Sequence, residues 1–260
     1  RELSTNEIFK PNAYYGIDYV IKKYADLPDD YPLKAIYPHG IRLGEFVWSA
    51  EMNSLIPILF SYNEKYKQVL NNATKEYRQV NFMKLSASPF LYVAELLKKQ
   101  PKPSREGTIF FPAHSTHHVT AKMDFQYLAE QLELLDDKYK PVSVCMYWRD
   151  FNLGHHIPFK ERGMKIISAG HMFDPLFLFR LYHLCSIHKY AGSNSLGSHL
   201  FYSAKAGCSF FLLDHGYSYI ASDKILKRDV GSIPLSVRSK ADYLFKKKTL
   251  ELTAEQLNFI

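Results

Sequence analysis

Two turns of this chain combine residue types that bind anions, and each comes directly after a short apolar segment predicted to be a strand. The first turn follows 108–112 and contains His114 and Ser115. The second begins at the end of 189–193, where a helix over 195–206 is expected to start. The free N–H groups of a helix start attract phosphate, and the carboxyl ends of parallel strands meet at one edge of a sheet. We therefore expect both turns to converge on one anionic ligand. The polar residues of the second turn are Ser193, Asn194, Ser195 and Ser198.

Glycines near these turns fit a ligand site. Gly197 precedes the expected helix and, having no side chain, lets a ligand approach the backbone closely. Gly170 and His171 follow another predicted strand, 164–168, where backbone groups could read the edge of a nucleobase. Simpler explanations stay open, because Ser and Asn are ordinary helix caps and a tight turn also needs glycine.

The first half of the chain offers candidates for a catalytic base. His39 and Glu45 lie just past a predicted strand at 33–38. A histidine or carboxylate that faces a substrate can take the proton of an attacking hydroxyl group. His39 and Glu45 are therefore candidate bases, and the alternative is that Glu45 is only solvated.

A group of histidines raises the alternative of a metal site. His114, His117 and His118 form an H-x-x-H-H pattern, and His171 and Asp174 form H-x-x-D further along. Imidazoles bind zinc and other transition metals, but this spacing matches no established ligand motif. We expect no metal ion and no cofactor.

Motifs of several large enzyme classes are missing from the sequence. It contains no G-x-G-x-x-G after a strand and no G-x-x-x-x-G-K-[ST], which argues against a dinucleotide dehydrogenase and a P-loop enzyme. It contains no G-x-S-x-G, so a hydrolase of that type has no nucleophile.

Composition limits the fold and the partners. The 260 residues suffice for one large or two small α/β domains, and the 47% of hydrophobic residues can fill their cores. An excess of 33 Lys and Arg over 26 Asp and Glu gives a net charge of +7, which favours an anionic partner. No basic run exceeds 246–248, so nucleic acid is not expected as a partner, whereas contact with an anionic membrane surface is permitted.

The three cysteines indicate a reducing environment. Cys145, Cys185 and Cys208 lie in apolar segments without paired spacing, so we expect reduced core thiols in a cytoplasmic protein. No apolar run is long enough to span a membrane, and we expect no signal peptide at the start. Because the chain begins with Arg1, we expect it to be part of a longer sequence.

Strands and helices are predicted to alternate after residue 107, which favours a parallel, doubly wound sheet. The polar, proline-broken stretch 98–107 is the best linker. We therefore expect an α/β fold with two Rossmann-like domains, at 1–100 and 107–260. The expected strands are 33–38, 55–60, 108–112, 141–147, 164–168, 189–193 and 208–213, and the expected helices are 63–71, 89–99, 124–137, 155–162, 174–188 and 195–206.

With these turns in this order, the chain resembles glycosyltransferases of the two-Rossmann (GT-B) architecture. Residues 107–214 resemble the nucleotide-sugar domain of bacterial enzymes that use CMP-activated acidic sugars, the sialyl- and Kdo-transferases. Those enzymes carry a His-Pro turn after the first strand of that domain and a Ser-Ser/Thr turn at a late helix. Here the first turn is His114-Ser115, and Asn194 separates the two serines of the second.

The resemblance implies a function and roles for the turns. His114, Ser115 and the 193–198 turn would bind the donor, and His39 or Glu45 of an acceptor-side domain at 1–100 would be the base. The expected activity is metal-independent transfer of a sugar, with a CMP-activated acidic sugar favoured, to a glycan or lipid-linked acceptor in bacterial polysaccharide or lipopolysaccharide synthesis. We expect the protein in the cytoplasm or at the inner membrane surface.

Three alternatives remain open at this level. The first is another enzyme on the same fold, a sugar-nucleotide epimerase or a polyol-phosphate transferase, the latter also having a turn like His39-Gly40. The second is a nucleotide-binding or scaffold domain without catalysis. The third is a metal-dependent hydrolase built on the histidine group.

Overall fold

The structure is a computed structural model that describes residues 8–73, 82–116, 119–221 and 233–260. Its contacts divide the chain into two compact units. Unit 1 comprises the described residues up to Lys99 together with Met172–Phe179 and 233–234, and unit 2 comprises the other described residues. The segment at 172–179 was expected in the second domain, but it belongs to unit 1. There Tyr15 N donates a hydrogen bond to Met172 O, and the Tyr15 ring lies 4.8 Å from that of Phe177.

Unit 1 contains a small parallel sheet with the strand order β1-β2-β3. Its buried core joins Ile36 and Leu59 of the sheet to Tyr66 and Leu70 of a covering helix. That helix starts where Asn63 Oδ1 accepts a hydrogen bond from Tyr66 N, an ordinary N-terminal cap. The elements are η2 (Lys10–Gly16), α1 (Ile17–Tyr24), β1 (Ala35–Ile36), α2 (Ser49–Met52), β2 (Ile58–Ser61), α3 (Glu64–Ala73), β3 (Phe82–Leu85) and α4 (Pro89–Leu96).

Unit 2 contains a five-stranded sheet with the order β7-β6-β4-β8-β9, in which every pair is parallel. The strands are β4 (Thr108–Phe111), β6 (Val142–Cys145), β7 (Lys165–Ile167), β8 (Tyr190–Ser193) and β9 (Ser209–Leu212). The chain starts in the middle at β4, moves outward to β7, then returns to the other side of β4. The strand order therefore reverses between β4 and β8, the place where open α/β sheets bind ligands.

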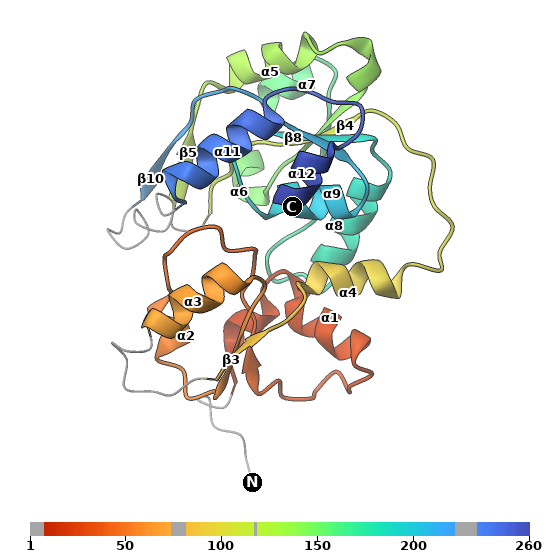
Figure 1. The fold of residues 1–260 in the computed structure, drawn as a ribbon. Coiled ribbons are helices and arrows are strands. Elements are labelled where there is room, and N and C mark those ends of the chain that lie inside the picture. Colours follow the sequence, from red (N-terminus) through yellow and green to blue (C-terminus); the bar gives the residue numbers. More distant parts are fainter. Residues whose placement is uncertain (1–7, 74–81, 117–118, 222–232) are drawn as a thin grey trace. The chain divides into compact units, whose positions relative to one another are not determined.

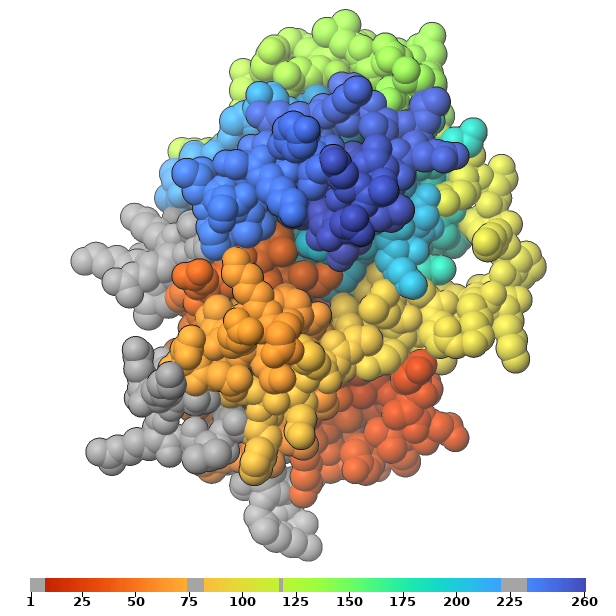
Figure 2. Space-filling view, in the orientation of Figure 1, coloured from red at the N-terminus to blue at the C-terminus, as the bar shows by residue number. Residues whose placement is uncertain are grey.

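All residues of β4, β8 and β9 are buried, which shows that both faces of this part of the sheet are covered. Right-handed crossovers place α5 (Phe125–Glu133) and α7 (Ile157–Glu161) on one face and α8 (Phe177–Ser186) and α9 (Ser198–Lys205) on the other. In Figure 1, α5 and α7 lie together. Helices α11 (Leu235–Phe245) and α12 (Ala254–Phe259) pack against each other and cover the front of unit 2 in Figure 2.

The centre of the sheet is packed too tightly for a side chain at one position. A Cβ atom added to Gly192 in β8 would lie 2.6 Å from the Phe211 ring and 2.9 Å from the Phe110 ring. Both rings are fully buried, so they have no room to withdraw. Glycine at this position thus lets the two phenylalanine side chains, from the strands on either side, pack together over β8.

The predicted α/β class with parallel sheets is confirmed, and the sequence reading missed several short elements. One of them is the antiparallel pair β5 (Val119–Lys122) and β10 (Ser218–Ala221), in which Val119 pairs with Ala221. Four-residue strands that pair across such a sequence distance leave little local signal. The other missed elements are η2, α1, α2, β3, α11, α12, the short α6 (Trp148–Asn152) and the 3₁₀ turn η3 (Asp137–Tyr139).

Helix α8 begins at Phe177, three residues later than expected. Asp174 Oδ1 accepts a hydrogen bond from Leu176 N and forms a turn of its own ahead of the helix. Among the helices of the described residues, none has the length and apolar character needed to cross a bilayer.

Candidate functional site

The candidate site lies in unit 2, at the edge of the sheet where the parallel strands end. The turns after β4, β6, β7 and β8 all reach this edge, because the four strands are neighbours and run in the same direction. The turns after β4 and β8 meet at the point where the strand order reverses. The sequence predicted this convergence of the 114–115 and 193–198 turns.

His114 is held between two buried neighbours. Ala113 and Ser115 are 1% and 0% exposed, whereas the His114 side chain is exposed. Ala113 N donates a hydrogen bond of 2.8 Å to Asn194 Oδ1, which ties this turn to the end of β8. The His114 ring lies 6.1 Å from the ring of Tyr147, at the end of β6. The backbone on both sides of His114 is therefore buried, and its imidazole is presented at the sheet edge.

Ser193 and Asn194 make internal contacts. Ser193 is fully buried, and its Oγ donates a hydrogen bond of 2.6 Å to Phe111 O while accepting one from Ser195 N. Asn194 is 6% exposed and holds Ala113 N. Both residues lie in the predicted turn, and their side-chain oxygens join the end of β8 to that of β4. Ser115 is likewise buried and engaged inside the protein.

The accessible part of the second turn consists of Ser195, Gly197 and Ser198, which are all partly exposed. Helix α9 begins at Ser198, and no side chain caps it within the described structure. A Cβ atom added to Gly197 would lie 3.1 Å from the His199 ring. The absence of a side chain at Gly197 therefore leaves space for the His199 imidazole.

His199, in the first turn of α9, packs between the ends of β4 and β8. The sequence alone indicated no definite role for it. Its Nε2 lies 2.9 Å from Ser195 O, and its ring stacks on Phe111 with a centroid distance of 5.5 Å. Burial lowers the pKa of His199 to about 4, against a smaller opposite effect of the hydrogen bond to Ser195. The imidazole is neutral at pH 7, so its Nε2–H donates to the carbonyl oxygen.

His114 is also biased toward its neutral form. Although its side chain is exposed, desolvation by the surrounding protein lowers the pKa of His114, and the Asp150 carboxylate opposes this effect. A neutral imidazole donates one hydrogen bond. A bound phosphate would favour the protonated form by its negative charge. His114 can therefore gain a proton as an anionic ligand binds.

Gly170 and His171 belong to the end of β7. Gly170 has φ of 111°, a conformation that a side chain disfavours, and its N–H donates to Ser168 Oγ. The His171 ring lies 5.4 Å from that of Trp148 and 6.4 Å from that of Tyr147. His171 is therefore part of a group of rings at the ends of β6 and β7.

The two predicted bases, His39 and Glu45, lie in unit 1 and differ in their surroundings. The His39 ring lies 6.0 Å from Tyr14, 6.1 Å from Tyr15 and 6.4 Å from Trp48. Burial, and then the nearby Arg42 charge, lower the pKa of His39 to about 3. Glu45 is exposed.

No group of three His, Cys, Asp or Glu side chains that could hold a metal ion occurs within the described ranges. His117 and His118 of the H-x-x-H-H pattern lie outside the described residues. The cysteines Cys185 and Cys208 are buried, as expected, and Cys145 is partly exposed. In the basic run 246–248, Lys246 pairs with Asp214 and Lys248 lies over the Phe211 ring.

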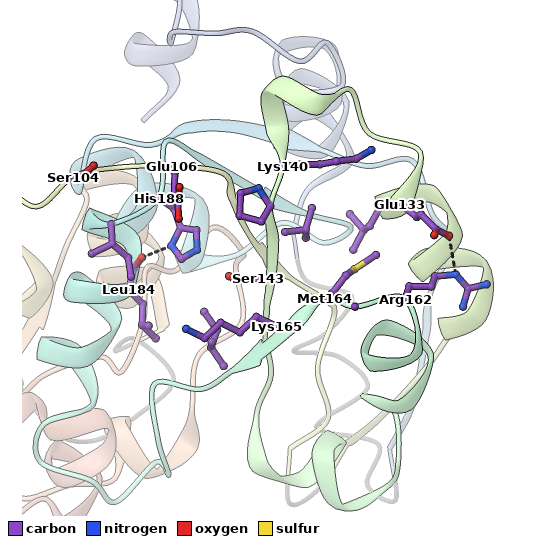
Figure 3. A pocket seen from close by; sticks show the side chains of 16 residues that line it. Ser104, Glu106, Glu133, Lys140, Ser143, Arg162, Met164, Lys165, Leu184 and His188 are labelled. Carbon is purple, nitrogen blue, oxygen red and sulfur yellow. Dashed lines mark hydrogen bonds and ion pairs between the residues drawn. The ribbon is translucent and has the colours of Figure 1, made fainter.

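A groove of about 720 Å³ lies elsewhere on unit 2 (Figure 3). Its lining includes Glu106, Val142 and Lys165, which stand at the amino-terminal ends of β4, β6 and β7. The groove is therefore at the opposite edge of the sheet from His114. Its Arg162 is paired with Glu133, and His188 Nδ1 is bonded to Leu184 O. Ligands of open parallel sheets bind at the carboxyl ends of the strands, so we favour the His114 edge as the site.

No family model, curated protein or solved structure was found to match this chain.

Proposed function

We propose that this protein is a glycosyltransferase that moves a sugar from a nucleotide-sugar donor to a glycan or lipid-linked acceptor. A CMP-activated acidic sugar is the favoured donor, on the resemblance of 107–214 to enzymes of that kind. The proposal includes a GT-B arrangement, with the donor on unit 2 and the acceptor on unit 1.

The observation that carries the proposal is the meeting of the β4 and β8 turns where the strand order reverses. This position supports binding of a nucleotide, because the start of a helix and an exposed histidine reach it together. Ser195, Gly197 and Ser198 are the accessible residues of the helix start, and His114 comes from the neighbouring turn.

The chemistry that these groups can perform is stabilisation of a leaving phosphate. When the bond from the sugar to the nucleotide breaks, negative charge grows on the phosphate oxygens. A helix start and a histidine that gains a proton both interact more strongly with this charge than with the intact donor, and such interactions lower the barrier. His114 would thus act as a hydrogen-bond donor that becomes cationic during the reaction.

The acceptor hydroxyl needs a base, and His39 and Glu45 are our candidates. The low pKa leaves His39 unprotonated at neutral pH, as a base must be, but also makes it a weak proton acceptor. Binding of an anionic donor nearby would raise that pKa and strengthen the base. Function at the cytoplasmic face of a membrane, with an anionic lipid surface as a partner, is part of the same proposal.

The proposal is tested by incubating the protein with CMP-, UDP- and GDP-sugars and candidate acceptors, followed by mass spectrometry of the products. We expect a glycosylated acceptor with a CMP-sugar, and loss of about 100-fold in rate in His114→Ala, as for removal of a donor to a developing anion. Cys145→Ser is the control in the same unit and should keep its activity. Full activity of His114→Ala would show that the site is wrong, and an epimerised or polyol-phosphate product would show that the reaction is another one.

A further inference from the structure

Asp150 is a buried carboxylate next to the candidate site that no motif pointed to. It lies in α6, directly after the end of β6, and is 3% exposed. A carboxylate removed from water is costly unless its oxygens accept hydrogen bonds, so its partners show what holds it there.

Both oxygens of Asp150 bind groups of the neighbouring turns. Oδ2 accepts a hydrogen bond of 2.8 Å from Ser115 N, and Oδ1 accepts one of 2.7 Å from Ser115 Oγ. Oδ1 also lies 3.0 Å from His155 Nδ1, which is the donor because a carboxylate only accepts. Ser115 Oγ accepts in turn from Ala121 N in the strand β5. Asp150 therefore connects the end of β6 to the residue that follows His114.

The two residues beside His114 are thus fixed from different strands. Ala113 is bonded to Asn194 from β8, and Ser115 is bonded to Asp150 from β6. An exposed histidine between two buried, bonded neighbours has little backbone freedom, which is what a group that must meet a ligand at one place requires.

We propose that Asp150 is a positioning residue of the His114 site, which fixes the turn that carries the imidazole and places a negative charge near it. This inference rests on the proposed function for the identity of the ligand, a nucleotide phosphate. It assigns to Asp150 both a geometric and an electrostatic effect on His114.

Asp150 is the charged group that acts on the pKa of His114. Of the described residues, Tyr147 faces His114 from the end of β6, and His199 interacts with it from α9. His199 is neutral at pH 7, because burial lowers its pKa to about 4. Desolvation lowers the pKa of His114, and Asp150 is the group that opposes this. Without the carboxylate, His114 should be harder to protonate and should hold a phosphate more weakly.

The test is an NMR titration of the histidine side chains in the full chain labelled with ¹³C-histidine, with the His114 signal assigned by its loss in His114→Gln. Asp150→Asn keeps the size of the side chain and removes its charge. We expect the pKa of His114 to be lower in this variant than in wild type. Ser115→Ala is the matched control, because it removes the two hydrogen bonds of the Ser115 hydroxyl group and keeps the Asp150 carboxylate, so the His114 titration should stay closer to that of wild type.

Calorimetric titration with CMP at pH 6.5 gives the second measurement. We expect Asp150→Asn to bind CMP about tenfold more weakly than wild type, the loss typical of one charge-assisted contact. A folded Asp150→Asn in which His114 titrates as in wild type would overturn the inference. If wild type does not bind CMP but the pKa of His114 still falls in the variant, the inference about Asp150 holds and the proposed function is the part that fails.

A second variant covers the case in which Asp150→Asn does not fold. Asp150→Glu keeps the charge and lengthens the side chain, so the Ser115 turn must shift to keep its bonds. We expect a displaced His114 signal in the ¹³C spectrum and weaker CMP binding. An unchanged signal and unchanged affinity in this variant would show that Asp150 does not position the turn.

Discussion

Single side chains at the carboxyl edge of unit 2 divide into those that hold the edge together and those that face outward. Ser193 and Asn194 belong to the first group, since their side chains form hydrogen bonds with the backbone at the end of β4. His114 and Ser195 keep accessible surface. Serines two positions apart in one turn therefore have different tasks, and substitution should separate them.

Ser193→Ala should destabilise the fold, because it leaves Phe111 O without its buried donor. The expected loss is about 1–3 kcal/mol in the free energy of unfolding. Ser195→Ala, the matched variant, should change stability by less than about 1 kcal/mol and weaken nucleotide binding. Urea unfolding and CMP titration of both proteins measure the two effects. Equal stability of the two variants would contradict the division of roles.

At the scale of elements, the packing of β4, β8 and β9 supports the sheet edge that carries the candidate site. The strand β8 passes between β4 and β9 and carries Gly192, over which the rings of Phe110 and Phe211 pack. The two rings meet over β8 and pack against one face of the sheet, next to the two strands whose ends form the site. Gly192 therefore contributes to the packing of the sheet that carries the site, without facing the site itself.

Gly192→Ala should destabilise the protein by about 1–3 kcal/mol, because the added methyl group overlaps two buried rings. Gly216→Ala is the control, since a Cβ atom there meets no atom within 4 Å. We expect that variant to be as stable as wild type or slightly more stable. Thermal unfolding measures both, and a neutral Gly192→Ala would show that the rings can yield.

Across the whole molecule, histidines that are largely shielded from solvent link folding to pH. Histidine in an unfolded chain has a pKa near 6.5, whereas burial lowers that of His199 to about 4 and that of His39 to about 3. Between these values and 6.5 the unfolded chain binds more protons than the folded one. Stability is therefore present above pH 6.5 and is lost as the pH falls.

We expect the free energy of unfolding to fall on the order of a few kcal/mol between pH 7 and pH 4.5, beyond the effect of the carboxylates. His199→Gln removes one of the titrating rings and can still donate to Ser195 O, so its pH dependence should be flatter than that of wild type. Urea unfolding at a series of pH values provides the comparison. Parallel curves for the two proteins would mean that His199 does not carry this dependence.

Much of the fold and part of the site could be predicted from the sequence. Alternating apolar segments predicted the parallel sheet, because each buried strand of four residues is a compact local signal between helices with their own pattern. The same reasoning placed His114 and Ser195 at strand ends. It did not separate Ser193 from Ser195, since which hydroxyl points inward depends on the neighbouring strand.

Asp150 was not found for a related reason. Its partner Ser115 is 35 residues away, and only the order β7-β6-β4-β8-β9 brings the ends of β4 and β6 together. The pair β5 and β10 was missed likewise, because each strand is short and its partner is distant. Contacts of this kind follow from topology, which the local pattern does not contain.

The most direct test of the nucleotide site is a thermal-shift series with CMP, CDP, UDP and GDP on wild type and Ser195→Ala. A ligand at about 100 times its dissociation constant stabilises the folded state by about 2.7 kcal/mol, which raises the midpoint by several degrees, at about 2–4 °C per kcal/mol for a chain of this size. We predict such a shift with CMP in wild type and a smaller one in Ser195→Ala. A shift with UDP or GDP alone would contradict the proposed donor, and no shift with any nucleotide would contradict the site itself.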